Sequence, residues 1–109
     1  MSEKTLFAPK DATGWPLTAG GLSHLALQNT DIELRYYAPR GADPQTPHDR
    51  DELYIVISGR GYFERRGRTL PFGPGDALFA GAGEQHRFTD FSEDFATWVI
   101  SFEIGRAHV

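Results

Sequence analysis

The spacing of apolar residues predicts a chain of short strands. Ile32, Leu34 and Tyr36 alternate with polar neighbours, which is the period of a half-buried strand. Residues 53–57 form a continuous β-branched and aromatic run, which predicts a strand buried on both faces. Further strands are expected at residues 76–80, at residues 86–88 and on the segment where one face carries Ala96, Trp98, Ile100 and Phe102. No segment has a convincing amphipathic helical pattern.

Glycine and proline mark the turns between these strands. Residues 58–61 and 66–68 predict hairpin turns, and residues 72–75 predict a tight turn in which glycine supplies a positive φ. Strands spaced this regularly favour a closed antiparallel sandwich or barrel, an all-β architecture that removes exposed sheet edges.

The first 21 residues differ from this pattern and are predicted to form an N-terminal arm. Pro9 and Gly14 belong to a set of prolines and glycines that interrupts any regular element there. Phe7 and Trp15 are too apolar for a solvated tail, so the arm is expected to dock on the barrel or on a partner chain. The predicted division is an arm at residues 1–21, a barrel domain at residues 22–106 and a tail at residues 107–109.

Composition narrows the function classes. The chain has 109 residues and no cysteine, so it is expected to form one domain without disulfides, zinc fingers or cysteine nucleophiles. A net charge of −4 argues against a nucleic-acid partner, and the arginines at positions 60, 65, 66 and 68 are interpreted as a solvated rim. Residues 1–10 lack the apolar run of a signal peptide, and no stretch reaches the ~20 apolar residues of a membrane helix. The chain is therefore expected to be cytoplasmic, without a membrane partner.

His48 and Glu52 are the most informative pair of polar residues. If their segment is extended, positions 46, 48, 50 and 52 share one face, and that row continues through Tyr54 and Val56 into the barrel. A histidine and a carboxylate aimed together into a barrel mouth form half of a divalent-metal site. From the spacing of these two residues alone, a hydrogen-bonded surface pair is the favoured interpretation.

His86 favours a metal site over a surface pair. It follows a predicted strand and the glycine loop at residues 81–83, where the backbone can turn tightly and bring one side chain inward from a neighbouring strand. His48, Glu52 and His86 would then form a two-histidine, one-carboxylate set with coordination positions open for water, substrate or dioxygen. His24 is interpreted as structural, and His108 as a residue of the terminal tail.

These residues resemble two sequence motifs of the cupin family, G(X)5HXH(X)3-4E(X)6G and G(X)5PXG(X)2H(X)3N. The matching residues are His48, Glu52 and Gly59 for the first motif and Gly75, Gly83 and His86 for the second, and Gly41 lies one residue after the position of the first motif glycine. The chain therefore resembles a small single-domain cupin over roughly residues 32–102. The resemblance implies a double-stranded β-helix, or jelly-roll, barrel with His48, Glu52 and His86 as metal ligands.

The chain departs from these motifs at three further positions. Thr46 stands where the first motif has its first histidine, Gly81 replaces the motif proline and Asp90 replaces the final asparagine. Threonine is a weak ligand for a transition metal, so the fourth position could be filled by the carbonyl oxygen of Gln45 or by water, or the metal could be lost. Metal binding is favoured over metal loss, because three ligand positions seldom persist together by accident.

The resemblance implies a metal-binding barrel that acts on or binds a small organic molecule. Nitrogen and oxygen donors favour Fe, Mn, Ni or Zn as the divalent metal. Two hypotheses are open: a dioxygenase- or isomerase-like enzyme, and a non-catalytic ligand-binding or sensing module with a structural or absent metal. Arg50 and Tyr54 are the candidates for positioning a substrate. Similar cupins pair as dimers, so a homodimer is expected, with the segment at residues 7–15 as a contact.

Overall fold

The chain forms eight strands and one short helix in the computed structural model, which describes residues 4–18 and 20–102. The 3₁₀ helix is η1 (Pro9–Gly14). The strands are β1 (Ser23–Gln28), β2 (Ile32–Tyr37), β3 (Asp51–Ser58), β4 (Gly61–Arg65), β5 (Arg68–Phe72), β6 (Ala77–Ala80), β7 (His86–Thr89) and β8 (Ala96–Phe102).

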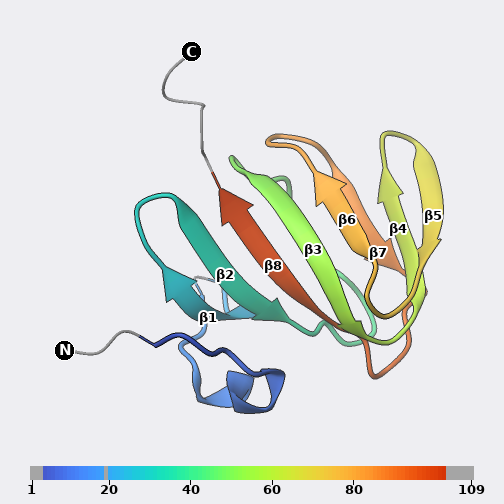
Figure 1. Ribbon diagram of the computed structural model, residues 1–109. Helices are drawn as coiled ribbons and strands as arrows, with labels where there is room; N and C mark the ends of the chain where they lie inside the picture. Colours follow the sequence, from blue (N-terminus) through green and yellow to red (C-terminus); the bar gives the residue numbers. More distant parts are fainter. Residues whose placement is uncertain (1–3, 19, 103–109) are drawn as a thin grey trace.

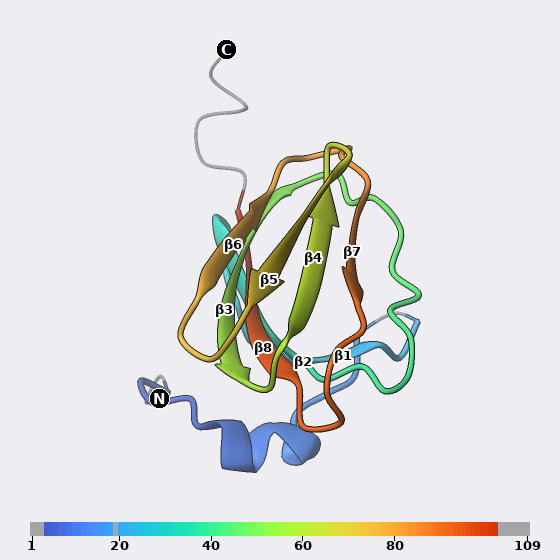
Figure 2. The same cartoon turned by 90° about the vertical axis from the view of Figure 1, so that its right-hand side faces the viewer.

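The strands form two antiparallel sheets. The larger sheet has the order β1-β2-β8-β3-β6 and the smaller one the order β5-β4-β7. Figure 2, turned by 90°, places β4, β5 and β7 in front of β3 and β8, so the sheets lie as two facing layers. The predicted all-β jelly-roll fold is confirmed. No helix within residues 4–18 and 20–102 is long and apolar enough to cross a membrane.

The core between the sheets is rich in aromatic rings. Its buried members are Tyr37, Tyr54, Val56, Phe63, Phe72, Ala80, Phe88, Phe95 and Val99. The prediction that residues 53–57 are buried on both faces is wrong: Glu52, Tyr54 and Val56 are buried, whereas Leu53, Ile55 and Ile57 are half-exposed. The reason is that β3 belongs to a sheet whose outer side is not packed against a second sheet.

The strands β2 and β8 place most of their predicted apolar rows on the outer side of the larger sheet. On β8, Thr97, Val99 and Ser101 are buried, and the neighbours Trp98 and Ile100 are half-exposed. Because Arg35 pairs in register with Val99, the charged position of β2 faces the space between the sheets. The alternation on β2 is therefore real, but its polar row is the inward one.

The turns agree with the sequence at one predicted hairpin and not at the other. Arg66 and Gly67 both have positive φ and join β4 to β5 as a hairpin. Residues 58–61 were expected to form a hairpin as well, but β3 and β4 belong to different sheets, so this segment crosses between the layers. A local turn pattern does not reveal the sheet in which the next strand pairs.

The N-terminal arm packs on the barrel of its own chain. Trp15 stacks on Trp98 with ring centroids 6.1 Å apart, and Phe7 meets Trp15 edge-on. His24 on β1 bonds the carbonyl oxygen of Trp15 through Nδ1 at 3.0 Å, which agrees with a structural role for this histidine. The expectation that proline and glycine prevent any regular element is wrong for η1, because proline at a helix start is compatible with a short 3₁₀ turn.

The division of the chain into arm, barrel and tail stays a prediction. The first strand of the barrel begins at Ser23, and an isolated bridge between Leu17 and His24 already ties the arm to it. Residues 103–106, the tail at residues 107–109 and therefore His108 lie outside the described part of the chain.

Candidate metal centre

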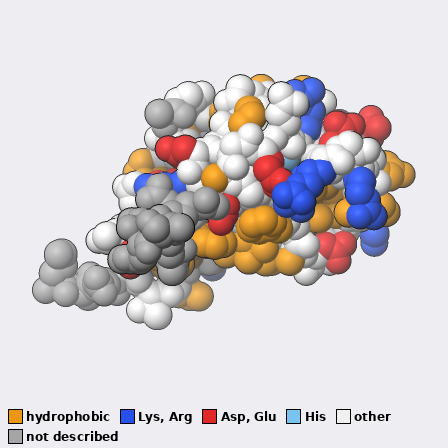
Figure 3. Space-filling view, turned by 90° about the horizontal axis from the view of Figure 1, so that it is seen from above, with side chains coloured by type: hydrophobic (Ala, Val, Ile, Leu, Met, Phe, Trp, Pro, Cys, Tyr) orange, Lys and Arg blue, Asp and Glu red, His pale blue; other side chains and the backbone are white. Residues whose placement is uncertain are grey.

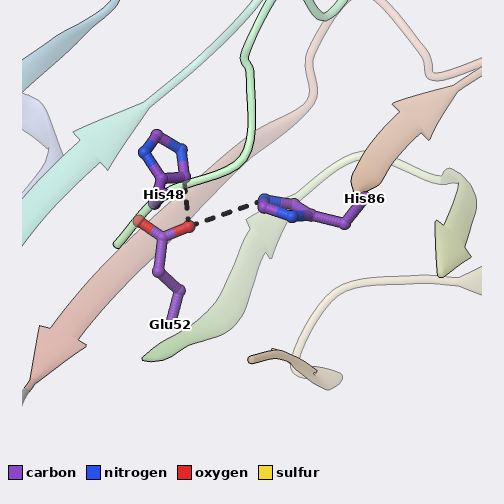
Figure 4. Close-up of side chains that lie close together, drawn as sticks. All are labelled: His48, Glu52 and His86. Carbon is purple, nitrogen blue, oxygen red and sulfur yellow. Dashed lines mark ion pairs between the residues drawn. The ribbon is translucent and has the colours of Figure 1, made fainter. Parts of the chain in front are cut away.

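His48, Glu52 and His86 converge at one end of the space between the sheets. Each offers one ligand atom, and these three atoms lie within 4.8 Å of one another. Glu52 Oε1 is 3.7 Å from His48 Nε2 and 3.6 Å from His86 Nε2, and Figure 4 shows both rings turned toward this carboxylate. Glu52 comes from β3 in the larger sheet and His86 from β7 in the smaller one, so the group bridges the two layers.

His48 reaches this group from a loop and not from a strand. The expected row of positions 46, 48, 50 and 52 on one strand face is wrong, because β3 begins at Asp51 and residues 49–50 form a bend. The backbone of His48 is held instead by Gly83, whose N–H donates to the His48 carbonyl oxygen at 2.6 Å. The glycine loop at residues 81–83 thus aligns His48 with His86.

Glu52 is held by both of its oxygens. Oε2 accepts hydrogen bonds from Arg35 Nη2 at 2.6 Å and from Ser101 Oγ at 3.2 Å, which leaves Oε1 facing the histidines. Burial by itself raises the pKa of Glu52. Hydrogen bonds from His86 and Tyr54 and the charges of His48 and Arg35 more than offset burial and lower this pKa to about 2. Glu52 is therefore ionised at neutral pH, the form in which a carboxylate can coordinate a metal.

His86 is oriented by a backbone carbonyl. Its Nδ1 lies 3.0 Å from the carbonyl oxygen of Glu84, and because a carbonyl oxygen only accepts, Nδ1 carries the hydrogen. Nε2 then faces Glu52. Burial lowers the pKa of His86, but the hydrogen bonds from the ring to Glu52 and to the Glu84 carbonyl outweigh burial and raise it. A ring held through Nδ1 with Nε2 directed inward is the usual arrangement of a metal-binding histidine.

Tyr54 and Gln45 complete the group. The Tyr54 hydroxyl lies 2.7 Å from Glu52 Oε1, 2.9 Å from His86 Nε2 and 3.3 Å from Gln45 Oε1. Gln45 turns its oxygen this way because its Nε2 donates to Asp43 Oδ2 at 2.7 Å. Gln45 Oε1 also lies 3.3 Å from His48 Nε2.

The donors and acceptors of this group fit a cation. Three acceptor atoms surround the Tyr54 hydroxyl, which has one proton to donate. When the His86 ring is neutral, the group therefore has an excess of lone pairs, and two imidazole nitrogens with carboxylate and amide oxygens are donors that Fe, Mn, Ni and Zn accept. The separations of 3.6 and 3.7 Å require only small shifts to place these atoms at ~2.0–2.2 Å from one ion.

Several residues that shape the site have no signal in the sequence motifs. Arg35 and Ser101 hold Glu52, and Asp43 holds Gln45 while also accepting from the Phe88 backbone N–H at 2.8 Å. The signal for Arg35 is its place in the middle of a strand between apolar residues. Asp43 lies in a loop and is buried, which cannot be recognised without the fold.

An open cleft of about 780 Å³ lies beside the group. Gln45, Thr46 and His86 are among the residues that line it, so Gln45 and His86 of the group border the cleft. Thr46 is exposed, and within residues 4–18 and 20–102 no hydrogen bond joins its side chain to His48, Glu52 or His86. Arg50 is half-buried and lies outside the cleft lining.

The Cupin domain family matches residues 34–102 of the chain. The chain belongs to the cupin family. The uncharacterized protein SCO3923 of Streptomyces coelicolor is 32% identical to this cupin over 79 residues, which cover 72% of this chain and 75% of the relative.

Solved structures show the same fold at lower identity. A protein of unknown function from Rhizobium leguminosarum superposes with a TM-score of 0.71 at 23% identity, over 93% of this chain and 98% of that one. A Cupin 2 conserved barrel domain protein from Salinispora arenicola superposes with a TM-score of 0.67 at 17% identity, over 97% of this chain and 95% of that one. The predicted resemblance to small single-domain cupins is confirmed.

Proposed function

We propose that this cupin binds one divalent transition metal through His48, Glu52 and His86, with Gln45 as the fourth donor, and acts on or binds a small organic molecule in the adjoining cleft. The observation that carries this proposal is the convergence of three ligand atoms within 4.8 Å from two sheets and a loop. The departure from the cupin motif at Thr46 is then compensated by the neighbouring residue Gln45, whose oxygen already points at the group.

The chain's own residues prepare the site before any ion arrives. Arg35 keeps Glu52 ionised and fixes its orientation, and Glu84 fixes the ring of His86. The Tyr54 hydroxyl lies within hydrogen-bond distance of Glu52, His86 and Gln45 and holds these side chains close together. A bound divalent ion would supply Lewis acidity or, as iron, dioxygen activation at positions that face the cleft.

Two functions are compatible with this site. The position of Gln45 and His86 at the cleft favours a dioxygenase- or isomerase-like enzyme. The engagement of both Glu52 oxygens favours the second candidate, a ligand-binding or sensing module, because Glu52 is not free to act as a general base.

Metal binding is tested by titrating tag-free protein with Zn(II), Fe(II), Mn(II) and Ni(II) in a calorimeter. We expect one ion per chain, and no binding after His86→Ala. His24→Ala is the matched control and should bind metal normally, because within the described residues the His24 side chain is hydrogen-bonded to the Trp15 carbonyl, away from the proposed ligands. Bound metal should also raise the melting temperature. A stoichiometry of zero with all four ions would exclude the proposal.

The two functions are separated by turnover. Metal-loaded protein is incubated with phenolic and keto-acid compounds while oxygen consumption and products are followed. Turnover that disappears in His86→Ala identifies an enzyme, and tight binding without turnover identifies a binding module. The homodimer and the cytoplasmic location remain predictions, and sedimentation of the purified chain tests the first of them.

A further inference from the structure

The cleft beside His86 differs in charge from the rest of the molecule. The whole chain has a net charge of −4. The charged residues that line the cleft are four arginines and two glutamates, namely Arg65, Arg66, Arg68, Arg87, Glu64 and Glu84. Figure 3, seen from above, shows most of the visible Lys and Arg side chains on its right-hand half, with Asp and Glu side chains beside them. We propose that the cleft binds a small organic carboxylate whose anionic group is held by Arg68. This assignment names the ligand class of the proposed function and rests on it.

The strand register places Arg68 in line with the metal-binding residues. Arg68 on β5 is paired with Arg65 on β4, and Arg65 is paired with His86 on β7. Partners in adjacent antiparallel strands share one face of the sheet. Arg68, Arg65 and His86 therefore form one row along the end of the smaller sheet. A ligand that lies along this row meets the guanidinium of Arg68 at one end and the proposed metal ligand His86 at the other.

Glu84 organises the arginines nearest to His86. Its Oε1 accepts from Arg65 Nε at 2.7 Å and its Oε2 from Arg66 Nε at 2.5 Å. The same carboxylate accepts from the Gly81 backbone N–H at 2.6 Å, which ties the arginines to the loop that positions His48 and His86. The rim is thus built onto the site and is not a set of independent surface charges.

Arg68 has no such partner. Within residues 4–18 and 20–102, no hydrogen bond or ion pair is found for the Arg68 or Arg87 side chain. Arg87 lies opposite Glu64 in the register of β4 and β7. Because Arg87 directly follows His86 in its strand, it belongs to the opposite face of the smaller sheet from the row of Arg68, Arg65 and His86. Arg68 is therefore the cleft arginine whose planar fork of donors is open to a ligand carboxylate.

The charges that line the cleft favour an anion with few negative charges. Two glutamates in the lining offset half of the four arginines, so the cleft attracts a monoanion or dianion more than a polyanion such as nucleic acid. The volume of about 780 Å³ is in the range of small-molecule sites. The earlier interpretation of the arginines as a solvated rim is retained for Arg60, which lies outside this cleft.

The test is an NMR titration of the full chain, both metal-free and Zn(II)-loaded, at low ionic strength. The probes are succinate and succinamide, which share a carbon skeleton and differ in charge, and inorganic phosphate is titrated in parallel. Succinate should shift the backbone amides of residues 64–69 and 84–87 and bind about tenfold more tightly than succinamide. Arg68→Gln should weaken succinate binding about tenfold, whereas the charge-matched control Arg60→Gln should leave it unchanged.

Each alternative outcome has a defined meaning. Equal binding of succinate and succinamide, or equal effects of Arg68→Gln and Arg60→Gln, overturns the carboxylate site. Phosphate binding at the same amides as tightly as succinate overturns the carboxylate as the ligand class. A Zn(II) titration of the same samples distinguishes the two proposals. Zinc binding without succinate binding would contradict the carboxylate site but not the metal centre. Succinate binding without zinc binding would contradict the metal centre but not the carboxylate site.

Discussion

Tyr54 is the single residue whose role changes most once its surroundings are known. The sequence predicts that Tyr54 contacts a substrate. In the structure its side chain is fully buried and its hydroxyl lies among Glu52, His86 and Gln45. Tyr54 is therefore placed to position the proposed metal ligands and not to contact a substrate. Burial raises the pKa of Tyr54, and so do the charge of Glu52 and the hydrogen bond to it, so the hydroxyl keeps its proton and continues to donate.

Tyr54→Phe should destabilise the metal-free protein by about 1–3 kcal/mol, because buried acceptors lose their donor. The loss should be smaller with saturating Zn(II), since the ion then satisfies Glu52 Oε1 and His86 Nε2. Urea unfolding with and without zinc measures both values. Tyr62→Phe, at an exposed tyrosine of β4, is the control and should change stability by less than about 0.5 kcal/mol. An equal loss with and without zinc would contradict this role for Tyr54.

Arg35→Met should destabilise the protein by about 3–5 kcal/mol, because it leaves the buried Glu52 carboxylate without its counter-charge. Adding Glu52→Gln should recover part of this loss, since a neutral amide needs no cation beside it. A double-mutant cycle from urea unfolding measures the coupling. Strictly additive effects of the two substitutions would show that the 2.6 Å ion pair between Arg35 and Glu52 does not matter for folding.

At the scale of elements, periodicity predicts where strands lie better than which way they face. The strand at residues 32–37 was expected at its observed position, and so was the core of β3. The inward row of β2 could not be predicted, because Arg35 turns inward to meet Glu52, a partner 17 positions further along the chain. Likewise, the crossing at residues 58–61 has the composition of a hairpin, and only packing against residues 92–95 distinguishes the two.

Gly59 makes that crossing feasible. Its φ is +85°, and a Cβ at this position would lie 2.5 Å from Phe95 Cα, which is backbone and cannot move aside cheaply. Gly59→Ala should therefore destabilise the protein by more than about 2 kcal/mol, from combined strain and overlap. Gly75→Ala is the matched control, because its φ is +86° and nothing lies within 4 Å. It should cost about 1–2 kcal/mol, from backbone strain alone. Equal losses in thermal unfolding would argue against the close contact.

At the scale of the whole molecule, the site depends on a junction between a loop and both sheets. Motif spacing predicted that His48, Glu52 and His86 belong together, and the structure brings them together with Gln45. The spacing could not predict Asp43, which accepts from Tyr37 on β2, from Gln45 in the loop and from the Phe88 backbone on β7. One buried carboxylate thus connects the larger sheet, the smaller sheet and the loop that carries His48.

This junction makes stability depend on pH in the alkaline range. Burial and the hydrogen bond to Asp43 raise the pKa of Tyr37 far above its usual value of about 10. The folded state therefore keeps Tyr37 protonated where the unfolded chain ionises. The stabilising contribution of Tyr37 is fully present below pH 10 and is lost as the pH rises above it.

Tyr37→Phe should remove that dependence. The difference in unfolding free energy between the wild type and Tyr37→Phe should be constant from pH 7 to about pH 9. By pH 11 it should fall by about 1.4 kcal/mol, because the unfolded wild-type chain is stabilised by ionising one more tyrosine. Urea unfolding at unit steps of pH measures the difference, and the other tyrosines cancel because both proteins contain them. A difference that stays constant to pH 11 would mean that the Tyr37 hydroxyl is not held by Asp43 in solution.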